Sequence, residues 1–372
     1  MRFVFVAPRF HTNQYEIVNA LIHEGHSVEF HTLLIGPTEE HSILKPKVFE
    51  PCFISRAITW IFGYGGVNKR RSFPNPYNYL MTLRERKPDF IIARDPIRWF
   101  SFLAALCARL QGIKVIFYSQ TPLYKQYSFA RTTLTKVLLK VFDAAWYTPL
   151  RGNKRSKENQ HPNWMYFVPF AVPIWTNRVD ILPKPKIIMV GKMETRKNHV
   201  LLIKAISLFK HKYQFSLTMV SECATKEHEK NKLLLINAIK KLGLSDIVQL
   251  HFNVKFKNMK NLYLNHNLFV LPSTDEPASI SVLEAFANGI PSICSDTNGT
   301  RYYITENVNG FVFRDGDVRD LAEKIEFCIS DKCRLRAMQK SSIELGSRTV
   351  TRQVFYNAFS NMLNNRWPRS LE

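Results

Sequence analysis

The sequence predicts an α/β protein built from two doubly wound domains, each a parallel sheet with helices on both faces. Three observations carry this prediction. Short apolar runs, which are typical of buried parallel strands, alternate with helical patterns along the chain. The alternation is interrupted once, where four prolines fall between residues 169 and 185, and it then resumes. A length of 372 residues is long for one domain and sufficient for two.

The first series of elements starts at the beginning of the chain. Residues 2–7 form a continuous apolar run, a helical pattern follows that Gly25 ends, and residues 28–33 alternate like a strand. A strand, a helix and a strand at this spacing form a parallel crossover unit. Further strands are expected at residues 90–93, 114–119 and 144–147.

The second series follows the proline-rich link. Its strands are expected at residues 186–191, 215–220, 247–252, 268–271, 291–294 and 311–313, and its last helices at 318–329, 331–345 and 350–364. We therefore expect domains at residues 1–170 and 171–348, with a final helical segment at 349–372 that packs back on the first domain. Two such domains place a ligand cleft at the carboxyl ends of their strands.

The charge of the chain is strongly positive. It has 52 Lys and Arg residues against 30 Asp and Glu residues, a net charge of +22, which divides into +12 up to residue 170 and +10 after it. Such a field attracts nucleotide phosphates, nucleic acid or an anionic membrane surface. A solvated, lysine-rich surface accounts for part of the excess.

The cysteines and the hydropathy of the chain indicate the cellular compartment in which the protein works. None of the six cysteines has the spacing of zinc ligands, and most lie in apolar runs, so we expect reduced, buried thiols of a cytoplasmic protein. The first apolar run is too short for a signal peptide. No run of about 18 apolar residues occurs, and we expect no segment that spans a membrane.

The most informative stretch covers residues 271–291. An apolar strand ends before a turn, and Ser279 is expected to cap a helix that Gly289 ends. The free amides of Ser279, Ile280 and Ser281 would then point into the cleft, where a helix N-terminus can hold a diphosphate.

Two glutamates lie in the same stretch. Glu276 is in the turn, and Glu284 stands eight positions later between Leu283 and Ala285 of a largely apolar helix. A charge in such a helix needs a functional or structural reason. The alternative interpretation is a surface acid in a loop and a solvated acid on a helix.

This stretch resembles the Glu-x7-Glu signature of the retaining glycosyltransferases with the GT-B fold, in particular glycosyltransferase family 4 (glycosyl transferases group 1). The sequel is similar as well: Gly289-Ile290-Pro291-Ser292-Ile293-Cys294-Ser295-Asp296, Gly299, Glu306-Asn307, Asn309-Gly310-Phe311-Val312 and Asp317. The resemblance is close from about residue 186 to 330 and looser before residue 170. It implies two Rossmann-like domains that face a cleft, the first binding the acceptor and the second binding the nucleotide sugar.

The resemblance also implies roles for the two glutamates. In the family the first glutamate contacts the hydroxyls of the donor sugar near the reacting carbon, which is the position of Glu276. The second binds the ribose of the nucleotide, which is the position of Glu284. A carboxylate that accepts two ribose hydroxyls fits this role, because hydrogen bonds to a charged acceptor are the stronger kind.

A second motif spans residues 190–199, where Lys192 and Lys197 follow the end of an expected strand. Fixed cations there can stabilise the charge that builds on a departing nucleoside diphosphate, without a metal. By resemblance Lys197 matches the lysine of the family and Lys192 stands where arginine is common, so Arg196 is a candidate substitute. The alternative is a basic, solvated turn.

Two residues of the first domain are candidates for the acceptor side. Gln120 stands near the point where the family often has a histidine. Glutamine cannot act as a general base, which fits a mechanism in which the phosphate of the donor takes the acceptor proton. His11, after the first strand, is the other candidate, although a loop histidine is more often merely solvated. The sequence has no Asp-x-Asp motif with flanking strands to hold a metal and no glycine-rich dinucleotide fingerprint after the first strand, so we expect neither a metal nor a cofactor.

The resemblance therefore implies a retaining hexosyltransferase, which we expect to be metal-independent. It would move a sugar from a UDP- or GDP-linked donor to a saccharide acceptor, in the synthesis of bacterial cell-surface polysaccharide or lipopolysaccharide. Three alternatives stay open: a nucleotide-sugar 2-epimerase of the same fold, a basic nucleic-acid-binding protein and a non-catalytic transferase. The even spread of charge speaks against a nucleic-acid groove, and the presence of both glutamates speaks against loss of catalysis.

One segment suggests where the protein works. Residues 52–62 form an apolar stretch of helix length that includes Trp60 and Phe62, and the cations Lys69, Arg70 and Arg71 follow. Aromatic side chains beside a basic cluster are typical of an interfacial membrane contact. A buried helix with a solvated loop after it explains the pattern equally well. The first interpretation predicts a cytoplasmic protein docked on the inner face of the plasma membrane, with a lipid-linked saccharide as acceptor.

Overall fold

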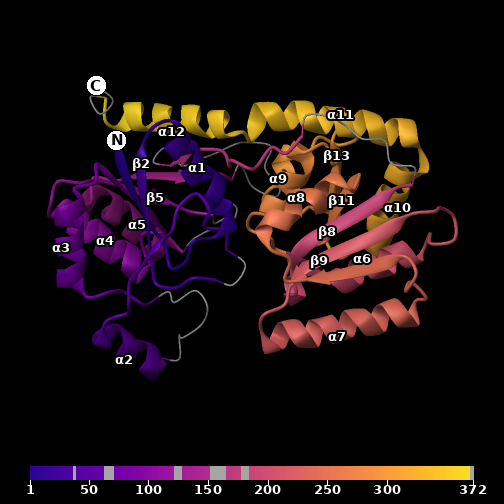
Figure 1. Cartoon of the computed structure of the whole chain (residues 1–372), viewed down its shortest axis with the longest axis horizontal. Helices are drawn as coiled ribbons and strands as arrows, with labels where there is room; N and C mark the ends of the chain where they lie inside the picture. Colours follow the sequence, from indigo (N-terminus) through magenta and orange to yellow (C-terminus); the bar gives the residue numbers. More distant parts are fainter. Residues whose placement is uncertain (37–38, 63–70, 121–127, 151–164, 177–183, 369–372) are drawn as a thin grey trace. The chain divides into compact units, whose positions relative to one another are not determined.

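The computed structural model describes residues 1–36, 39–62, 71–120, 128–150, 165–176 and 184–368, and for Thr59 and Phe62 it describes the backbone alone. These residues divide into two compact units (Figure 1). The first unit comprises the described residues up to Leu150, residues 165–171 and residues from Arg352 onward, and the second comprises those from Val172 to Thr351. The chain thus passes from one unit to the other within the proline-rich link.

The first unit is built on a seven-stranded parallel sheet with the order β3-β2-β1-β4-β5-β6-β7. Its strands are β1 (Arg2–Val6), β2 (Ser27–Thr32), β3 (Lys47–Val48), β4 (Phe90–Arg94), β5 (Lys114–Tyr118), β6 (Ala145–Thr148) and β7 (Tyr166–Phe167). Its helices are η1 (Thr12–Gln14), α1 (Tyr15–His23), α2 (Phe53–Phe62), α3 (Pro76–Arg86), α4 (Trp99–Arg109), α5 (Phe129–Val141) and α12 (Arg352–Arg366). The predicted strands of this half are present close to their expected bounds. The two-residue strands β3 and β7 were not predicted, since so short a pairing leaves no periodic pattern.

Alternate residues of β1 face two different helical layers, as the pleat of a strand requires. Phe3 and Phe5 pack into a core with α1 and α12, whereas Val4 and Val6 pack into a core with α3 and α4. Helix α12 comes from the far end of the chain and lies beside α1 (Figure 1). Its buried Phe359 contacts Phe3 with the ring centroids 5.9 Å apart. The end of the chain thus completes the core of the first unit.

The second unit is built on a six-stranded parallel sheet with the order β10-β9-β8-β11-β12-β13. Its strands are β8 (Lys186–Lys192), β9 (Ser216–Glu222), β10 (Val248–Phe252), β11 (Leu268–Leu271), β12 (Ser292–Ser295) and β13 (Gly310–Phe313). Its helices are η2 (Thr195–Lys197), α6 (His199–Ser207), α7 (Lys226–Lys241), α8 (Phe256–Leu264), α9 (Ile280–Ala287), η3 (Arg301–Tyr303), α10 (Val318–Ser330) and α11 (Lys332–Thr349). All six strands lie where the apolar runs predict them.

The strand order of each sheet reverses at one point. In the first sheet this point lies between β1 and β4, and in the second it lies between β8 and β11. In doubly wound sheets, ligands bind beyond the carboxyl ends of the strands at such a switch point. The fold therefore predicts ligand binding at the loops that follow β8 and β11 and at those that follow β1 and β4.

The cysteines depart in part from the expectation of buried thiols. Cys107, Cys223, Cys294 and Cys328 are buried, but Cys52 is half-buried and Cys333 is exposed on α11. Cys333 is the second residue of α11 and follows the capping residue Asp331 by two positions, so it lies at a surface helix end. Among the residues that the structure describes, no helix is long and apolar enough to cross a bilayer.

Candidate active site

Glu276 lies at the switch point of the second sheet, in the loop between β11 and α9, and its side chain is buried. One of its oxygens, Oε2, accepts a hydrogen bond from Nη1 of Arg196 at 2.5 Å and another from Nζ of Lys197. Both cations belong to η2, which follows β8. The stretch of residues 271–291 and the motif of residues 190–199 lie apart in the sequence, but their charged side chains meet in one cluster.

Backbone bonds fix the two loops against each other. The amide of Thr274 donates to the carbonyl of Arg196 at 2.8 Å, and the amide of Gly299 donates to the carbonyl of Glu276 at 2.8 Å. A side chain at position 299 is excluded, because its Cβ would lie 2.0 Å from the carbonyl oxygen of Pro277. The absence of a side chain at Gly299 thus allows the close contact that holds the loop carrying Glu276.

The electrostatics of the cluster follow from its burial. Burial lowers the pKa of Lys197, and the negative charge of Glu276 opposes that effect without cancelling it. Burial also lowers the pKa of Arg196, but the charges of Glu276 and Glu194 outweigh it and leave that pKa raised. Glu194 accepts from Nε of Arg196 at 2.7 Å. Arg196 and Lys197 are therefore paired with carboxylates. An incoming diphosphate would have to replace these carboxylates on the two cations.

Glu284 lies inside α9 and is 8% exposed, which confirms that the carboxylate is not a solvated one. The hydroxyl of Tyr263, on α8, donates to Oε2 of Glu284 at 2.9 Å. Burial, together with the charge of Glu284, raises the pKa of Tyr263 well above its ordinary value, so the phenol keeps its proton. Trp175 stacks on Tyr263 with the ring centroids 5.4 Å apart. This packing orients the carboxylate that the resemblance assigns to the ribose.

The N-terminus of α9 also lies at the carboxyl edge of the sheet, because the helix follows β11. Ser279 is the N-cap residue as predicted, but its hydroxyl does not cap the helix. It is 3.0 Å from the hydroxyl of Ser281, which donates to the carbonyl of Val190 at 3.1 Å. The hydroxyls therefore tie α9 to the end of β8. The first amides of the helix, including that of Ile280, remain the candidates for a phosphate.

Lys192 is paired with a different carboxylate from the one at the centre of the Glu276 cluster. It is the last residue of β8, and its Nζ lies 3.6 Å from Oε2 of Glu222 at the end of β9. Its side chain is 35% exposed, whereas that of Lys197 is 9% exposed. The geometry favours Lys197 and Arg196 over Lys192 as partners of a buried anion.

His199 stands two positions after Lys197 and was not among the predicted site residues. It is the first residue of α6, and its Nε2 lies 3.0 Å from the hydroxyl of Ser221. Burial and the charge of Lys197 lower the pKa of His199 to about 3, so the ring is neutral at physiological pH. It links the start of α6 to the end of β9. In the sequence, the position of His199 within the motif of residues 190–199 is the feature that could have identified it.

The acceptor-side candidates belong to the first unit. His11 follows β1 and precedes η1, and Gln120 follows β5. Oε1 of Gln120 accepts from Nη2 of Arg94 at 3.5 Å. Arg94 is the last residue of β4, so Gln120 and Arg94 lie together at the carboxyl edge of the first sheet.

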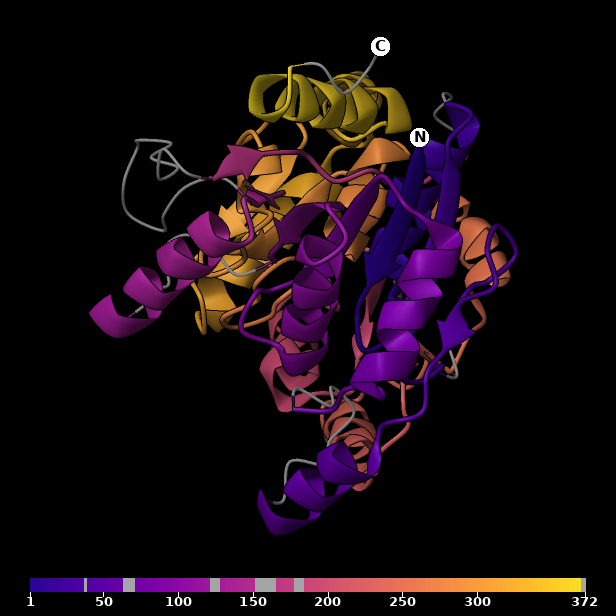
Figure 2. The ribbon, with the colours of Figure 1, turned by 90° about the vertical axis from the view of Figure 1, so that its left-hand side faces the viewer.

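Four large apolar side chains of α2 that the structure describes are exposed, which rules out the interpretation as a fully buried helix. Phe53 is 85% exposed, Trp60 86%, and Ile54 and Ile61 lie between 60% and 65%. Helix α2 stands at the margin of the first unit in both views (Figures 1 and 2). Arg71 is described and half-buried. The predicted contacts Lys69 and Arg70, and the side chain of Phe62, lie outside the described residues.

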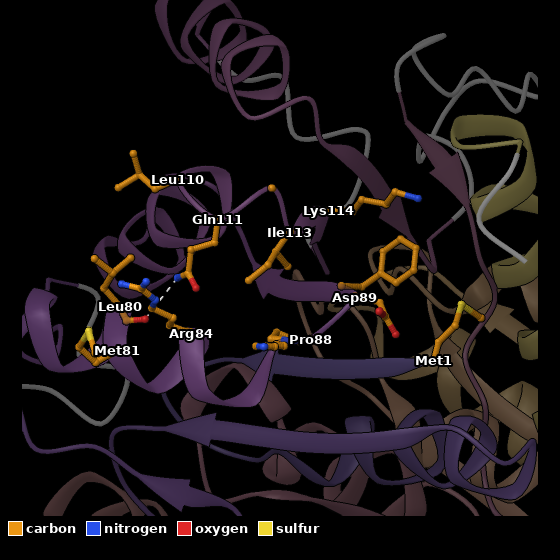
Figure 3. A pocket seen from close by; sticks show the side chains of 13 residues that line it. Met1, Leu80, Met81, Arg84, Pro88, Asp89, Leu110, Gln111, Ile113 and Lys114 are labelled. Carbon is orange, nitrogen blue, oxygen red and sulfur yellow. Dashed lines mark hydrogen bonds between the residues drawn. The ribbon is translucent and has the colours of Figure 1, made fainter.

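A pocket of about 970 Å³ lies elsewhere in the first unit (Figure 3). It is lined by Met1, by residues of α3 such as Arg84 and by residues 87–90 and 110–114. These segments precede β1, β4 and β5, so the pocket lies at the amino ends of the strands. That is the edge opposite to the one where doubly wound sheets bind ligands.

Residues 175–344 match the family model described as glycosyl transferases group 1. Over 163 residues the chain is 29% identical to the N,N'-diacetylbacillosaminyl-diphospho-undecaprenol alpha-1,3-N-acetylgalactosaminyltransferase of Campylobacter jejuni, covering 42% of this chain and 39% of that protein. It is 26% identical to the D-inositol 3-phosphate glycosyltransferase of Thermobispora bispora over 115 residues, or 31% of this chain and 27% of that one. The chain thus spans at most about two-fifths of the length of these two relatives.

Solved structures of low sequence identity have the same fold. A glycosyltransferase from Rickettsia africae superimposes with a TM-score of 0.75 at 15% identity, covering 99% of both chains. The Anabaena protein HepE in complex with UDP-glucose superimposes with a TM-score of 0.74 at 14% identity, covering 98% of this chain and all of that one. The fold is α/β with two Rossmann-like domains, the GT-B architecture.

Proposed function

We propose that this protein is a retaining glycosyltransferase of family 4, which moves a hexose from a UDP- or GDP-linked donor to a saccharide acceptor. One observation carries the proposal: the buried carboxylate of Glu276 is bonded to Arg196 and Lys197 at the switch point of the second sheet. Glu284 follows in the adjoining helix. The match of residues 175–344 to the glycosyl transferases group 1 supports it.

The cluster suggests how the donor binds. The diphosphate of the donor takes the place of Glu276 on Arg196 and Lys197, helped by the first amides of α9. Glu276 is then free to accept hydrogen bonds from the hydroxyls of the donor sugar. Because the two cations are already fixed, they stabilise the leaving diphosphate without reorganisation.

The transfer step needs neither a metal nor a cofactor in this proposal. The bond between the anomeric carbon and the diphosphate oxygen breaks, and its electron pair stays on the diphosphate. The acceptor oxygen bonds to the same face of the carbon, and its proton passes to the departing phosphate. Gln120 and His11 position the acceptor, and Lys192 contributes its positive charge to the edge of the donor site.

A panel of nucleotide sugars tests this function. The protein is expected to hydrolyse one UDP- or GDP-linked hexose slowly without an acceptor, with retention at the anomeric carbon, and the rate should survive EDTA. Nuclear magnetic resonance of the released sugar reports the anomer. Loss of activity in EDTA that a divalent ion restores would contradict the metal-free mechanism. Conversion of the donor to its C2 epimer would identify an epimerase instead.

Glu284→Ala is expected to weaken binding of the nucleoside diphosphate, because two ribose hydroxyls lose a charged acceptor. Each lost bond costs at most about 1.5–3 kcal/mol. Calorimetry with UDP and GDP measures the change. The control is Tyr263→Phe, which removes the hydroxyl that orients Glu284 but keeps the carboxylate, and which should have a smaller effect. Equal affinities in the wild type and Glu284→Ala would remove Glu284 from the nucleotide site.

We also propose that the enzyme acts at the inner face of a bacterial plasma membrane, in the synthesis of cell-surface polysaccharide or lipopolysaccharide. The exposed aromatic and aliphatic side chains of α2 enter the bilayer boundary. The net charge of +22 attracts anionic headgroups, and each cation near the surface contributes about 1 kcal/mol. The acceptor named for the Campylobacter relative is lipid-linked, which supports a lipid-linked saccharide here.

Liposome flotation tests the membrane contact. The wild type is expected to float with anionic vesicles, more at low than at physiological salt, because salt screens the charge. Trp60→Glu with Ile61→Glu should abolish flotation, and changing Lys69, Arg70 and Arg71 together to Glu should reduce it. The control is Leu233→Glu with Leu234→Glu on α7, which are 61% and 53% exposed in the second unit. Equal flotation of the α2 variant would exclude this helix as the contact.

A further inference from the structure

A groove of about 410 Å³ crosses the outer surface of the first unit between α4 and α5. Its lining is apolar throughout. The lining includes Phe73 ahead of α3, Trp99, Phe102 and Leu106 on α4, and Leu134 and Leu138 on α5. The volume lies within the range of about 300–1,000 Å³ that small-molecule sites occupy.

The groove is not a by-product of a few isolated apolar residues. On α4, Trp99, Phe102 and Leu106 recur every three or four positions, and each is 40–41% exposed. On α5, Leu134 and Val137 are also about half exposed. Each helix also packs its other face in the core beneath it. The two helices thus present one continuous apolar strip to the outside, which calls for an occupant.

Charge at one end of the groove indicates what that occupant is. Helices α4 and α5 follow β4 and β5, so their N-termini lie at the carboxyl edge of the sheet, where partial positive charge collects. Arg94 ends β4 at this edge, and Arg131 stands one turn before Leu134 on α5. Asp95 is the acid facing them, 3.7 Å from Arg131. Neither α4 nor α5, all of whose residues are described, carries an acidic side chain.

A cationic end and an apolar channel match an amphiphile with an anionic head and a hydrocarbon tail. The cationic end is also where Gln120 meets Arg94, so a molecule held this way would present its head beside the acceptor-side residue. Phe73 adds a link to α2. Its carbonyl accepts from the amide of Cys52 at 3.1 Å, and its ring lies against that of Trp99 in a tilted arrangement with the centroids 5.7 Å apart. The groove therefore begins beside the base of the helix assigned to the membrane surface.

We propose that the groove between α4 and α5 holds the hydrocarbon chain of a lipid-linked acceptor, with the lipid phosphate beside Arg94 and Arg131. The interpretation of the bound lipid as part of the acceptor rests on the proposed transferase function. The tail lies along α4 and α5, and the saccharide projects from the carboxyl edge past Gln120. The site selects acceptors by their lipid, separately from the donor site in the second unit.

Binding of farnesyl phosphate, a soluble isoprenoid phosphate, tests the site, with inorganic phosphate as the ligand without a tail. By calorimetry the full-length protein is expected to bind farnesyl phosphate at least about tenfold more tightly than phosphate, since burial of a few methylene groups suffices for that factor. Leu106→Asp and Leu134→Asp, at positions 41% and 48% exposed, should each lose about tenfold in affinity. Leu208→Asp, at a position 56% exposed in the second unit, should lose nothing.

Several outcomes would overturn the lipid site. Equal affinity for farnesyl phosphate and phosphate, no binding of either, or unchanged affinity in both groove variants would each do so. Dissociation of a wild-type dimer by Leu106→Asp, seen by sedimentation, would show that a second copy of the chain fills the groove. Calorimetry with UDP and GDP on the same samples checks the second unit. Lipid binding without turnover of any nucleotide sugar would leave the site standing and contradict the transferase proposal instead.

Discussion

Glu276→Gln is expected to reduce sugar transfer by roughly a hundredfold to a thousandfold, the range found when one preorganised polar group is removed from an active site. The substitution keeps the shape of the side chain and removes its negative charge. In the proposed mechanism that charge lies beside the reacting carbon, where positive charge develops as the diphosphate leaves. Initial rates with a saturating donor measure the loss.

The same variant should still bind the nucleoside diphosphate, and more tightly than the wild type. In the wild type the diphosphate must displace Glu276 from Arg196 and Lys197, and glutamine competes far less for these cations. Calorimetry with the free nucleotide therefore separates catalysis from binding. Parallel loss of transfer and nucleotide binding would indicate a folding defect and leave the assigned role without support.

The melting temperature provides a second, independent measurement on the Glu276→Gln variant. Removing one partner of a buried ion pair costs on the order of 3–5 kcal/mol, and the cost is smaller here because the Arg196 side chain is 39% exposed. Glu276→Gln should lower the melting temperature, and the nucleoside diphosphate should restore part of it. Asp275→Asn is the matched control. Its side chain is exposed, and asparagine tolerates the backbone angle φ of 46° at this position.

The sequence predicted the strands well, because each strand is a local pattern. Each apolar run lies in one segment, and Gly289 marks the end of α9 through its positive φ of 78°. The contact between Glu276 and Lys197 was not predictable in this way. It joins residues 79 positions apart, and it exists because β8 and β11 are neighbours in the sheet. Strand order is a property of the whole fold, and no periodicity reports it.

Two local interpretations were decided only by the structure. Ser279 has the residue type and position of an N-cap, but its hydroxyl lies near Ser281 instead, since Ser281 itself is bonded to the end of β8. The apolar stretch that begins at Phe53 fits a buried helix and a surface helix equally well by composition. Only its place at the margin of the first unit leaves Phe53 and Trp60 exposed.

Lys197→Met is expected to lower kcat by about a hundredfold or more, with a smaller change in the KM of the donor. The charge on the leaving diphosphate is greatest in the transition state, so the loss of a fixed cation falls on turnover more than on binding. Methionine keeps the apolar stem, which occupies the space beside Gly191 where a Cβ at that position would meet it at 3.4 Å. Lys204→Met, at an exposed position on the adjoining α6, is the control and should behave like the wild type.

The double variant Lys197→Met with Glu276→Gln then tests whether the two residues work as one unit. If the lysine acts only on the diphosphate and the glutamate only on the sugar, their effects on kcat/KM multiply. The bond between them predicts otherwise. With Lys197 gone, Glu276 stays bonded to Arg196 and hinders the incoming phosphate, so Glu276→Gln should cost much less in the Lys197→Met background than in the wild type. Strictly multiplicative losses would show that the ion pair has no part in donor binding, and near-normal turnover of Lys197→Met alone would remove the lysine from the mechanism.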